Sequence, residues 1–146
     1  MKNSILIRLT ALVLLTFALL VLGATQVNAQ TTYAPTGAQA SGPHYALFIF
    51  AVNNQPMHVV LDAGNCEIAI AYGLGDPFEV FYPSTCAATV DSQGVFHNLM
   101  GATSFKLDDG TQGTVNVSSW KEMKSCNNHG CAYRVVAGYS VSITVQ

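Results

Sequence analysis

Apolar and polar residues alternate most clearly near the end of the chain. From Tyr133 onward every second residue is apolar, and the residues between them are mostly polar. A two-residue period is typical of a strand with one buried face. It predicts one long strand from Tyr133 to Val145, with a bulge or bend at Gly138. The residues on the apolar side are Tyr133, Val135, Ala137, Tyr139, Val141, Ile143 and Val145.

Shorter apolar runs separated by Gly, Pro, Asn and Asp fill the segment from residue 44 onward. The run His44–Val52 is almost wholly apolar, which is typical of a strand covered on both faces. The Asp-Gly pair at 109–110 lies between two alternating runs and predicts a hairpin. Only Trp120–Ser125 has the pattern of a helical turn. The other predicted strands lie around Met57–Leu61, Cys66–Tyr72, Phe78–Tyr82, Cys86–Asp91 and Val95–Leu99.

About eight short strands with almost no helix, within one body of about 100 residues, predict an all-β fold. The expected architecture is an antiparallel β-sandwich over residues 44–146, with a small β-barrel as the alternative. Residues 30–43 contain no charge, two prolines and two glycines, and have no periodic apolar face. This composition predicts a flexible linker.

Residues 1–29 have the pattern of a cleaved signal peptide. Basic Lys2 and Arg8 precede an apolar run from Leu9 to Leu22, and Val27-Asn28-Ala29 provides a cleavage site after Ala29. The apolar run is short for a membrane span, so we expect no span after cleavage. The predicted location is secreted, extracellular or periplasmic.

The four cysteines, Cys66, Cys86, Cys126 and Cys131, are even in number, which in an exported domain indicates two disulfides. Three pairings are possible. A short, turn-forming loop between Cys126 and Cys131 favours a bond there, which leaves Cys66 for Cys86. Asn127, Asn128 and His129 would then form an exposed tip and a candidate binding loop; the alternative is a stapled hairpin with a solvated tip.

Trp120 is the single tryptophan and the second candidate for binding. Its parity matches Thr114, Asn116 and Ser118 and differs from that of Val115 and Val117. A strand continuing to residue 120 would turn the ring away from the core, where it can stack on a sugar or anchor a protein contact. If the strand ends at Ser119, the ring instead closes the edge of the sandwich.

Metal sites have weaker support. Asp108, Asp109 and Gln112 offer several oxygens within five residues, the ligand type that calcium prefers, but an ordinary hairpin turn explains them equally. Met57-His58 and the pair His97 and Met100 combine thioether and imidazole groups that suit copper. Their positions also fit a core methionine and a half-buried histidine. We expect no cofactor.

Low charge guides the functional interpretation. Charged residues make up 10% of the chain, which argues against a disordered or nucleic-acid-binding protein. The sequence contains no G-x-S-x-G turn, phosphate loop or H-E-x-x-H motif. We therefore predict an exported, non-enzymatic binding or structural and assembly module. A protein partner or self-association is favoured over carbohydrate; a small secreted hydrolase and a calcium- or copper-binding module are the alternatives. Asn116-Val117-Ser118 is also an N-glycosylation triplet.

Overall fold

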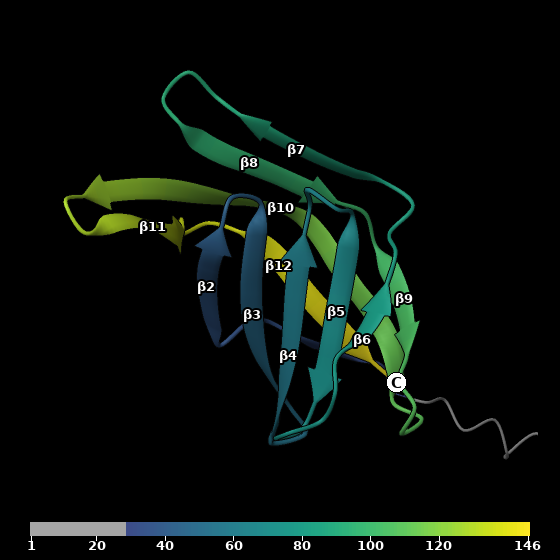
Figure 1. Ribbon diagram of the computed structural model, residues 1–146. Helices are drawn as coiled ribbons and strands as arrows, with labels where there is room; N and C mark the ends of the chain where they lie inside the picture. The colour runs from purple at the N-terminus through teal and green to yellow at the C-terminus, as the bar shows by residue number, and fades with distance from the viewer. Residues whose placement is uncertain (1–28) are drawn as a thin grey trace, which may run out of the picture.

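The computed structural model describes residues 29–146 and forms two antiparallel sheets (Figure 1). Twelve strands and no helix occur in this part of the chain, so the predicted all-β class is confirmed. The sheets remain separate over these residues and form a sandwich rather than a closed barrel. The predicted signal peptide lies outside the described residues, apart from Ala29.

The first sheet contains five strands in the order β2-β3-β4-β5-β6. Each strand pairs with its neighbour in sequence, as in a meander. Asn53 and Asn54 join β3 to β4 with φ angles of 50° and 62°, and asparagine is one of the few residues that tolerate the two positive φ values of a tight hairpin turn. The strands are β2 (Gly37–Gly42), β3 (Tyr45–Val52), β4 (Gln55–Asp62), β5 (Glu67–Tyr72) and β6 (Glu79–Phe81).

The second sheet contains seven strands, and its main path runs β1-β12-β10-β8-β7. Strands β9 and β11 also pair with the long strand β10. The predicted Asp-Gly hairpin is confirmed, since Lys106 pairs with Gln112 across the turn that contains Asp109 and Gly110. The strands are β1 (Thr31–Tyr33), β7 (Cys86–Val90), β8 (Val95–Met100), β9 (Thr103–Lys106), β10 (Gln112–Asn127), β11 (Gly130–Val135) and β12 (Ser140–Val145).

Alternating apolar residues from both sheets fill the space between them. The predicted inward parity of Met57, Val59 and Leu61 is confirmed, because all three are fully buried. Side chains of this size each contribute roughly 1.5–3 kcal/mol when removed from water. Other fully buried members of the core include Phe48, Phe50, Val52, Ile68, Ile70, Val115 and Ile143.

The expectation of a flexible linker over residues 30–43 is wrong. This segment contains β1, which pairs with β12, and β2, which pairs with β3. Edge strands gain backbone hydrogen bonds from a neighbour on one side and need little apolar surface of their own. Ala40 is the one buried residue of β2, at 6% exposure, and Ala38 packs partly buried against the core. Because most side chains of this segment are small or polar, the sequence of residues 30–43 shows no alternation of apolar and polar positions that would have predicted the two strands.

The predicted single strand Tyr133–Val145 is divided in two. Gly138 adopts a φ of 89°, and the chain leaves the sheet between β11 and β12. Strand β12 pairs with the first half of β10, whereas β11 pairs with the second half. The parity remains correct in β12, where Val141, Ile143 and Val145 are buried.

A bulge divides β10 into two regions with different neighbours. The register shifts between Val117 and Ser119, so residues before and after this point follow opposite parities. Residues 112–117 pair with β9 and β12, and residues 120–127 pair with β8 and β11. We call the second half of β10 together with β7, β8 and β11 the wing. Figure 1 shows the β10–β11 hairpin reaching beyond the five-stranded sheet. Trp120–Ser125 lies in this strand, so the helical turn expected there is wrong.

Both disulfides form with the predicted pairing. Cys66 is bonded to Cys86, with a Cα–Cα distance of 5.9 Å, and links the β4–β5 turn of one sheet to β7 of the other. Cys126 is bonded to Cys131 across the β10–β11 hairpin, with a Cα–Cα distance of 4.0 Å. The first bond joins the two layers, and the second lies within the wing.

Candidate binding surface

The outward face of the five-stranded sheet carries a row of aliphatic side chains. Leu47, Val60, Ala69 and Val80 are neighbours in register on β3, β4, β5 and β6. Their parity is opposite to that of the core residues on the same strands, so they face away from the other sheet. Among residues 29–146, no strand or loop packs over this row, and Val80 is 47% exposed. We call this surface the outer face.

A shallow groove lies in the outer face next to this row. It has a volume of about 320 Å³. Leu47 and Val60 contribute its aliphatic surface, and Tyr45 and Phe78 contribute two aromatic rings that are 38% and 49% exposed. Gln39, Ser41 and His58 complete the lining, so no carboxylate, lysine or arginine lines the groove. A partner would meet apolar surface with a few hydrogen-bonding groups.

Exposed apolar side chains are frequent on and next to the five-stranded sheet. Five of the eight large hydrophobic residues exposed in the structure lie on β3, on β6 or in the segments that flank β6. Soluble proteins rarely leave contiguous apolar patches uncovered unless the patch has a binding role. The five are Tyr45, Leu74, Phe78, Val80 and Tyr82.

The apolar run His44–Val52 contributes to this surface, although its sequence predicted a different arrangement. The almost wholly apolar run His44–Val52 predicts a strand covered on both faces. In the structure β3 is covered on one face only, where Phe48 and Phe50 enter the core. Leu47 and Ile49 on the other face are half-buried. An apolar strand with one uncovered face indicates a surface that is available to a partner.

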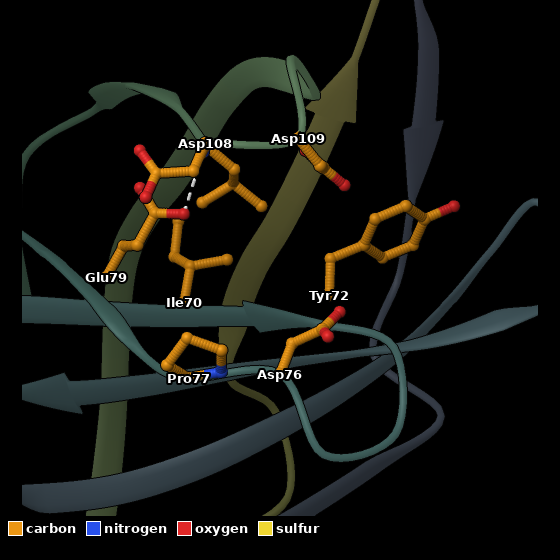
Figure 2. A pocket seen from close by; sticks show the side chains of 8 residues that line it. Ile70, Tyr72, Asp76, Pro77, Glu79, Asp108 and Asp109 are labelled. Atoms are coloured by element: carbon orange, nitrogen blue, oxygen red, sulfur yellow. Dashed lines mark hydrogen bonds between the residues drawn. The ribbon is translucent and has the colours of Figure 1, made fainter.

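A second recess is acidic. Asp76, Glu79, Asp108 and Asp109 line it together with Tyr72, and its volume is about 160 Å³ (Figure 2). The Asp108 backbone N–H donates a hydrogen bond to Oε1 of Glu79 at 2.8 Å, which anchors the β9–β10 turn. Figure 2 shows Glu79 beside Asp108, with Asp76 and Tyr72 further along the recess.

The calcium candidates do not form a ligand set. The Asp109 carboxylate accepts hydrogen bonds from the backbone N–H and the hydroxyl of Thr111, at 2.8 and 3.0 Å. The Gln112 side-chain amide instead donates to Oε1 of Gln146 at 3.3 Å. Within residues 29–146, no group of three or more His, Cys, Asp or Glu side chains is placed to hold a metal ion. The hydrogen bonds of Asp109 to Thr111 are those of a hairpin turn, whereas Gln112 begins β10.

The copper candidates are also separated. Met57 is fully buried and Met100 is 1% exposed, so both belong to the core. His58 follows Met57 on β4 and faces the opposite side of the sheet, in the groove of the outer face. His97 forms a hydrogen bond with Asp91 at 2.8 Å. That bond, together with the Val95 and Gln93 backbone N–H groups, lowers the pKa of Asp91 below its ordinary value.

Trp120 is not an exposed ring. The expectation that it points away from the core is wrong, because only 1% of the residue is accessible. The bulge after Val117 inserts one residue and turns Trp120 inward, where its ring packs edge-on against Phe48 with centroids 6.4 Å apart. A buried indole cannot stack on a ligand, so Trp120 is a core residue. The alternative interpretation is right that the ring is buried, but wrong that the strand ends at Ser119, because β10 continues to Asn127.

A buried carboxylate beside Trp120 was missed by the sequence analysis. Glu122 is fully buried, and its oxygens accept hydrogen bonds from the His44 backbone N–H at 2.6 Å and from the indole N–H of Trp120 at 3.3 Å. Asn98 donates at 3.4 Å and also contacts Nδ1 of His44 at 2.6 Å. Burial raises the pKa of Glu122, and the three donors partly offset that effect. This network ties the β2–β3 turn to the wing.

The tip of the β10–β11 hairpin is exposed, as predicted. The strands continue to Asn127 and Gly130, so the turn itself consists of Asn128 and His129. The Asn127 side-chain oxygen accepts a hydrogen bond from the His129 backbone N–H at 2.8 Å, which orders the turn. His129 is exposed at this tip. These three residues lie at the end of the wing and do not line the groove of the outer face.

Comparisons with known proteins identify no relative: no family model, no curated protein sequence and no solved structure matches the chain. In the described part of the chain, no helix is long and apolar enough to cross a membrane. The two disulfides are consistent with an oxidising extracellular compartment.

Proposed function

We propose that this protein is an exported, non-enzymatic β-sandwich that binds another protein at the cell exterior, as a recognition or assembly module. The observation that carries this proposal is the row of aliphatic side chains on the outer face together with its groove, whose lining contains no carboxylate, lysine or arginine. Partly exposed Tyr45, Phe78 and Val80 surround half-buried Leu47 and Val60. Burying such side chains against a partner releases the free energy that association requires.

The chemistry of the groove favours a protein partner with an apolar surface. Leu47 and Val60 supply aliphatic surface, and aliphatic side chains pack well against other aliphatic side chains. Tyr45 and Phe78 add two aromatic rings to the lining, and aromatic residues are enriched at the centres of protein interfaces. No carboxylate, lysine or arginine lines the groove, so docking removes none of these charged groups from water.

Export is supported by two separate observations. The basic, apolar and small-residue order of residues 1–29 is typical of a signal peptide. Two disulfides in a domain of this size are typical of proteins that fold in an oxidising compartment. An exterior location also agrees with a binding role, since recognition surfaces of exported domains meet other extracellular macromolecules.

Site-specific photo-crosslinking in the producing cells tests the proposal. A photoreactive phenylalanine at Val80, in the outer face, should form a discrete protein adduct. The same residue at Ser142, on the outward face of β12, should not. Val60→Lys places a charge in the groove and should lower the adduct yield at least about tenfold, since a desolvated unpaired charge is costly.

The contradicting outcomes are distinct. An equal adduct yield at positions 80 and 142, or no adduct at position 80, would overturn the protein-binding proposal. Binding to a glycan array that is lost in Val60→Lys would assign the groove to carbohydrate instead, with Tyr45 and Phe78 as stacking rings. Circular dichroism of Val60→Lys provides the folding control.

A further inference from the structure

We infer that β7 is a self-complementary edge through which two copies of this chain pair antiparallel into one continuous sheet. This inference goes beyond the proposed function, because β7 belongs to the other sheet and shares no residue with the outer face. Strand β7 is the outermost strand of the seven-stranded sheet and pairs only with β8 in the described part of the chain (Figure 1).

The backbone geometry shows which groups of β7 face the free edge. The Asp91 N–H donates to the Val95 carbonyl at 3.0 Å, and the Gly101 N–H donates to the Thr85 carbonyl at 2.9 Å. In a regular antiparallel pair, hydrogen-bonded positions alternate, so residues 85, 87, 89 and 91 bond to β8. The backbone groups of Cys86, Ala88 and Val90 therefore point away from β8. These three residues offer three N–H and three C=O groups to a partner strand.

Every other edge strand in residues 29–146 carries a feature that discourages pairing, and β7 carries none. Exposed edges are commonly protected by short length, charge, proline, a bulge or cover from another segment. Strand β7 is uncharged, has no proline, and keeps regular register with β8 over its five residues.

The protective features differ from edge to edge. Strand β6 has three residues, carries Glu79 and lies between Pro77 and Pro83. Strand β1 also has three residues. Strand β9 carries Lys106, and β11 carries Arg134. Strand β2 has a register shift after Ala40 and contacts β11.

The sequence of β7 fits a twofold axis through Ala88. Antiparallel pairing of two copies then places Cys86 opposite Val90 and Ala87 opposite Thr89, with Ala88 opposite itself. The nearest charge, Asp91, falls opposite Thr85, so no like charges meet. The outward-facing groups of two copies can form six backbone hydrogen bonds. Such a twofold interface uses the same patch on both copies and closes at the dimer.

Exposed apolar side chains flank this edge on both faces of the sheet. Val90 is 57% exposed on the face that turns towards the core, and Leu99 is 49% exposed on the other face, next to Ala87 in register. Pairing would cover part of both residues. The Cys66–Cys86 bond fixes the start of β7 to the other sheet. The edge is therefore preorganised, which lowers the entropy cost of pairing with a second copy.

Sedimentation of the purified, oxidised protein over a wide concentration range tests the inference. The expected result is a monomer–dimer equilibrium without larger species. Ala88→Pro removes an N–H that faces the free edge and leaves the bonds to β8 intact, so the fold should be retained. The two Ala88 N–H groups of the dimer account for two of its six bonds. We therefore expect a rise in the dimer dissociation constant of at least about 30-fold.

Two controls make the result specific. Val60→Lys alters the outer face and should leave the dimer dissociation constant unchanged, which separates this inference from the proposed function. Amide hydrogen exchange at Ala88 and Val90 should slow as protein concentration rises, and exchange at Thr89, already bonded to β8, should not. Circular dichroism should show the same fold for Ala88→Pro as for the wild type.

Each remaining outcome contradicts the inference. A wild-type protein that stays monomeric at every concentration has no such interface. A dimer that survives in folded Ala88→Pro uses another surface. Species that grow beyond the dimer would mean head-to-tail pairing and would overturn the twofold register. Thr89→Lys, which adds a charge without removing a backbone donor, should also weaken the dimer; no effect there would contradict the placement of residue 89 opposite Ala87.

Discussion

The two halves of β10 face the same interior and are stabilised in different ways. Before the bulge, Val115 and Val117 are 0% and 2% exposed and lie beside Ile143 and Val141 of β12 in a dry apolar layer. After the bulge, the inward positions are Trp120 and Glu122, and Glu122 is held by hydrogen bonds. Apolar burial is non-directional, whereas hydrogen bonds require particular partners at particular distances. The first half is therefore held by apolar burial alone, whereas the second half combines the buried Trp120 ring with hydrogen bonds that fix the wing to the β2–β3 turn.

The largest expected effect lies in the first half. Val115→Asp places a carboxylate in the apolar layer without a partner and should lower the free energy of unfolding by roughly 3–5 kcal/mol. Asn116→Asp, one residue along and on the outward face, should cost less than about 1 kcal/mol. Chemical denaturation of the oxidised protein measures both. Equal losses at the two positions would show that the register of β10 described above is wrong.

A smaller effect is expected in the second half. Glu122→Ala leaves the His44 N–H and the indole N–H of Trp120 without their acceptor, and one unsatisfied buried donor costs about 1–3 kcal/mol. Because the network joins the wing to the β2–β3 turn, amide exchange should accelerate most in residues 120–127 and 130–135. Uniform acceleration through the whole sandwich would show that Glu122 does not act locally.

The same carboxylate should give a characteristic dependence on pH. Burial raises the folded pKa of Glu122, so the native state holds its proton at pH values where the unfolded chain has released it. The stability contributed by the protonated group is therefore complete below the ordinary carboxyl pKa and declines as pH rises through the folded pKa. Glu122→Gln cannot titrate, and its unfolding free energy should vary less with pH across that window. An unchanged pH profile in Glu122→Gln would contradict this assignment.

Strands with an unbroken register could be predicted from the sequence, whereas the bulged strand β10 could not. Simple alternation identified β4, β5 and β12, because each has one face in the apolar layer. The cysteine pairing followed from a short loop of turn-forming residues. The position of Trp120 did not follow, because the bulge near Ser118 and Ser119 reverses parity and leaves no compositional mark. A pattern rule assumes an unbroken register and fails where one residue is inserted.

Glu122 was missed for a different reason. Two of its three donors, His44 and Asn98, are 78 and 24 residues distant in the chain. In the sequence, Glu122 follows Lys121 and lies two residues before Lys124, a charged setting that is typical of a solvent-exposed residue. Only the folded arrangement brings its partners together, so no local signal marks it. The groove residues Leu47 and Val60 were visible as apolar positions, but whether their outward face is covered depends on tertiary structure.

The smallest effect is expected at the end of the wing. Replacing Cys126 and Cys131 together by serine opens a loop with a sequence separation of 5, and chain entropy assigns such a bond about 2 kcal/mol at most. Replacing Cys66 and Cys86, with a separation of 20, should cost more, at about 3 kcal/mol. Melting temperatures of the two double variants measure the difference. A larger loss at the hairpin would mean that the wing contributes more to global stability than the comparison predicts.

The pairing of β1 with β12 has a consequence for when the domain can be completed. Thr31 lies opposite Val145 in register, so the first described strand finds its partner only in the last. During synthesis β1 emerges more than a hundred residues before β12, and β12 also supplies one neighbour of β10. Closing so long a loop is slow, as for other folds dominated by distant contacts. Because the first described strand must wait for β12, the seven-stranded sheet cannot be completed until synthesis has reached residue 145.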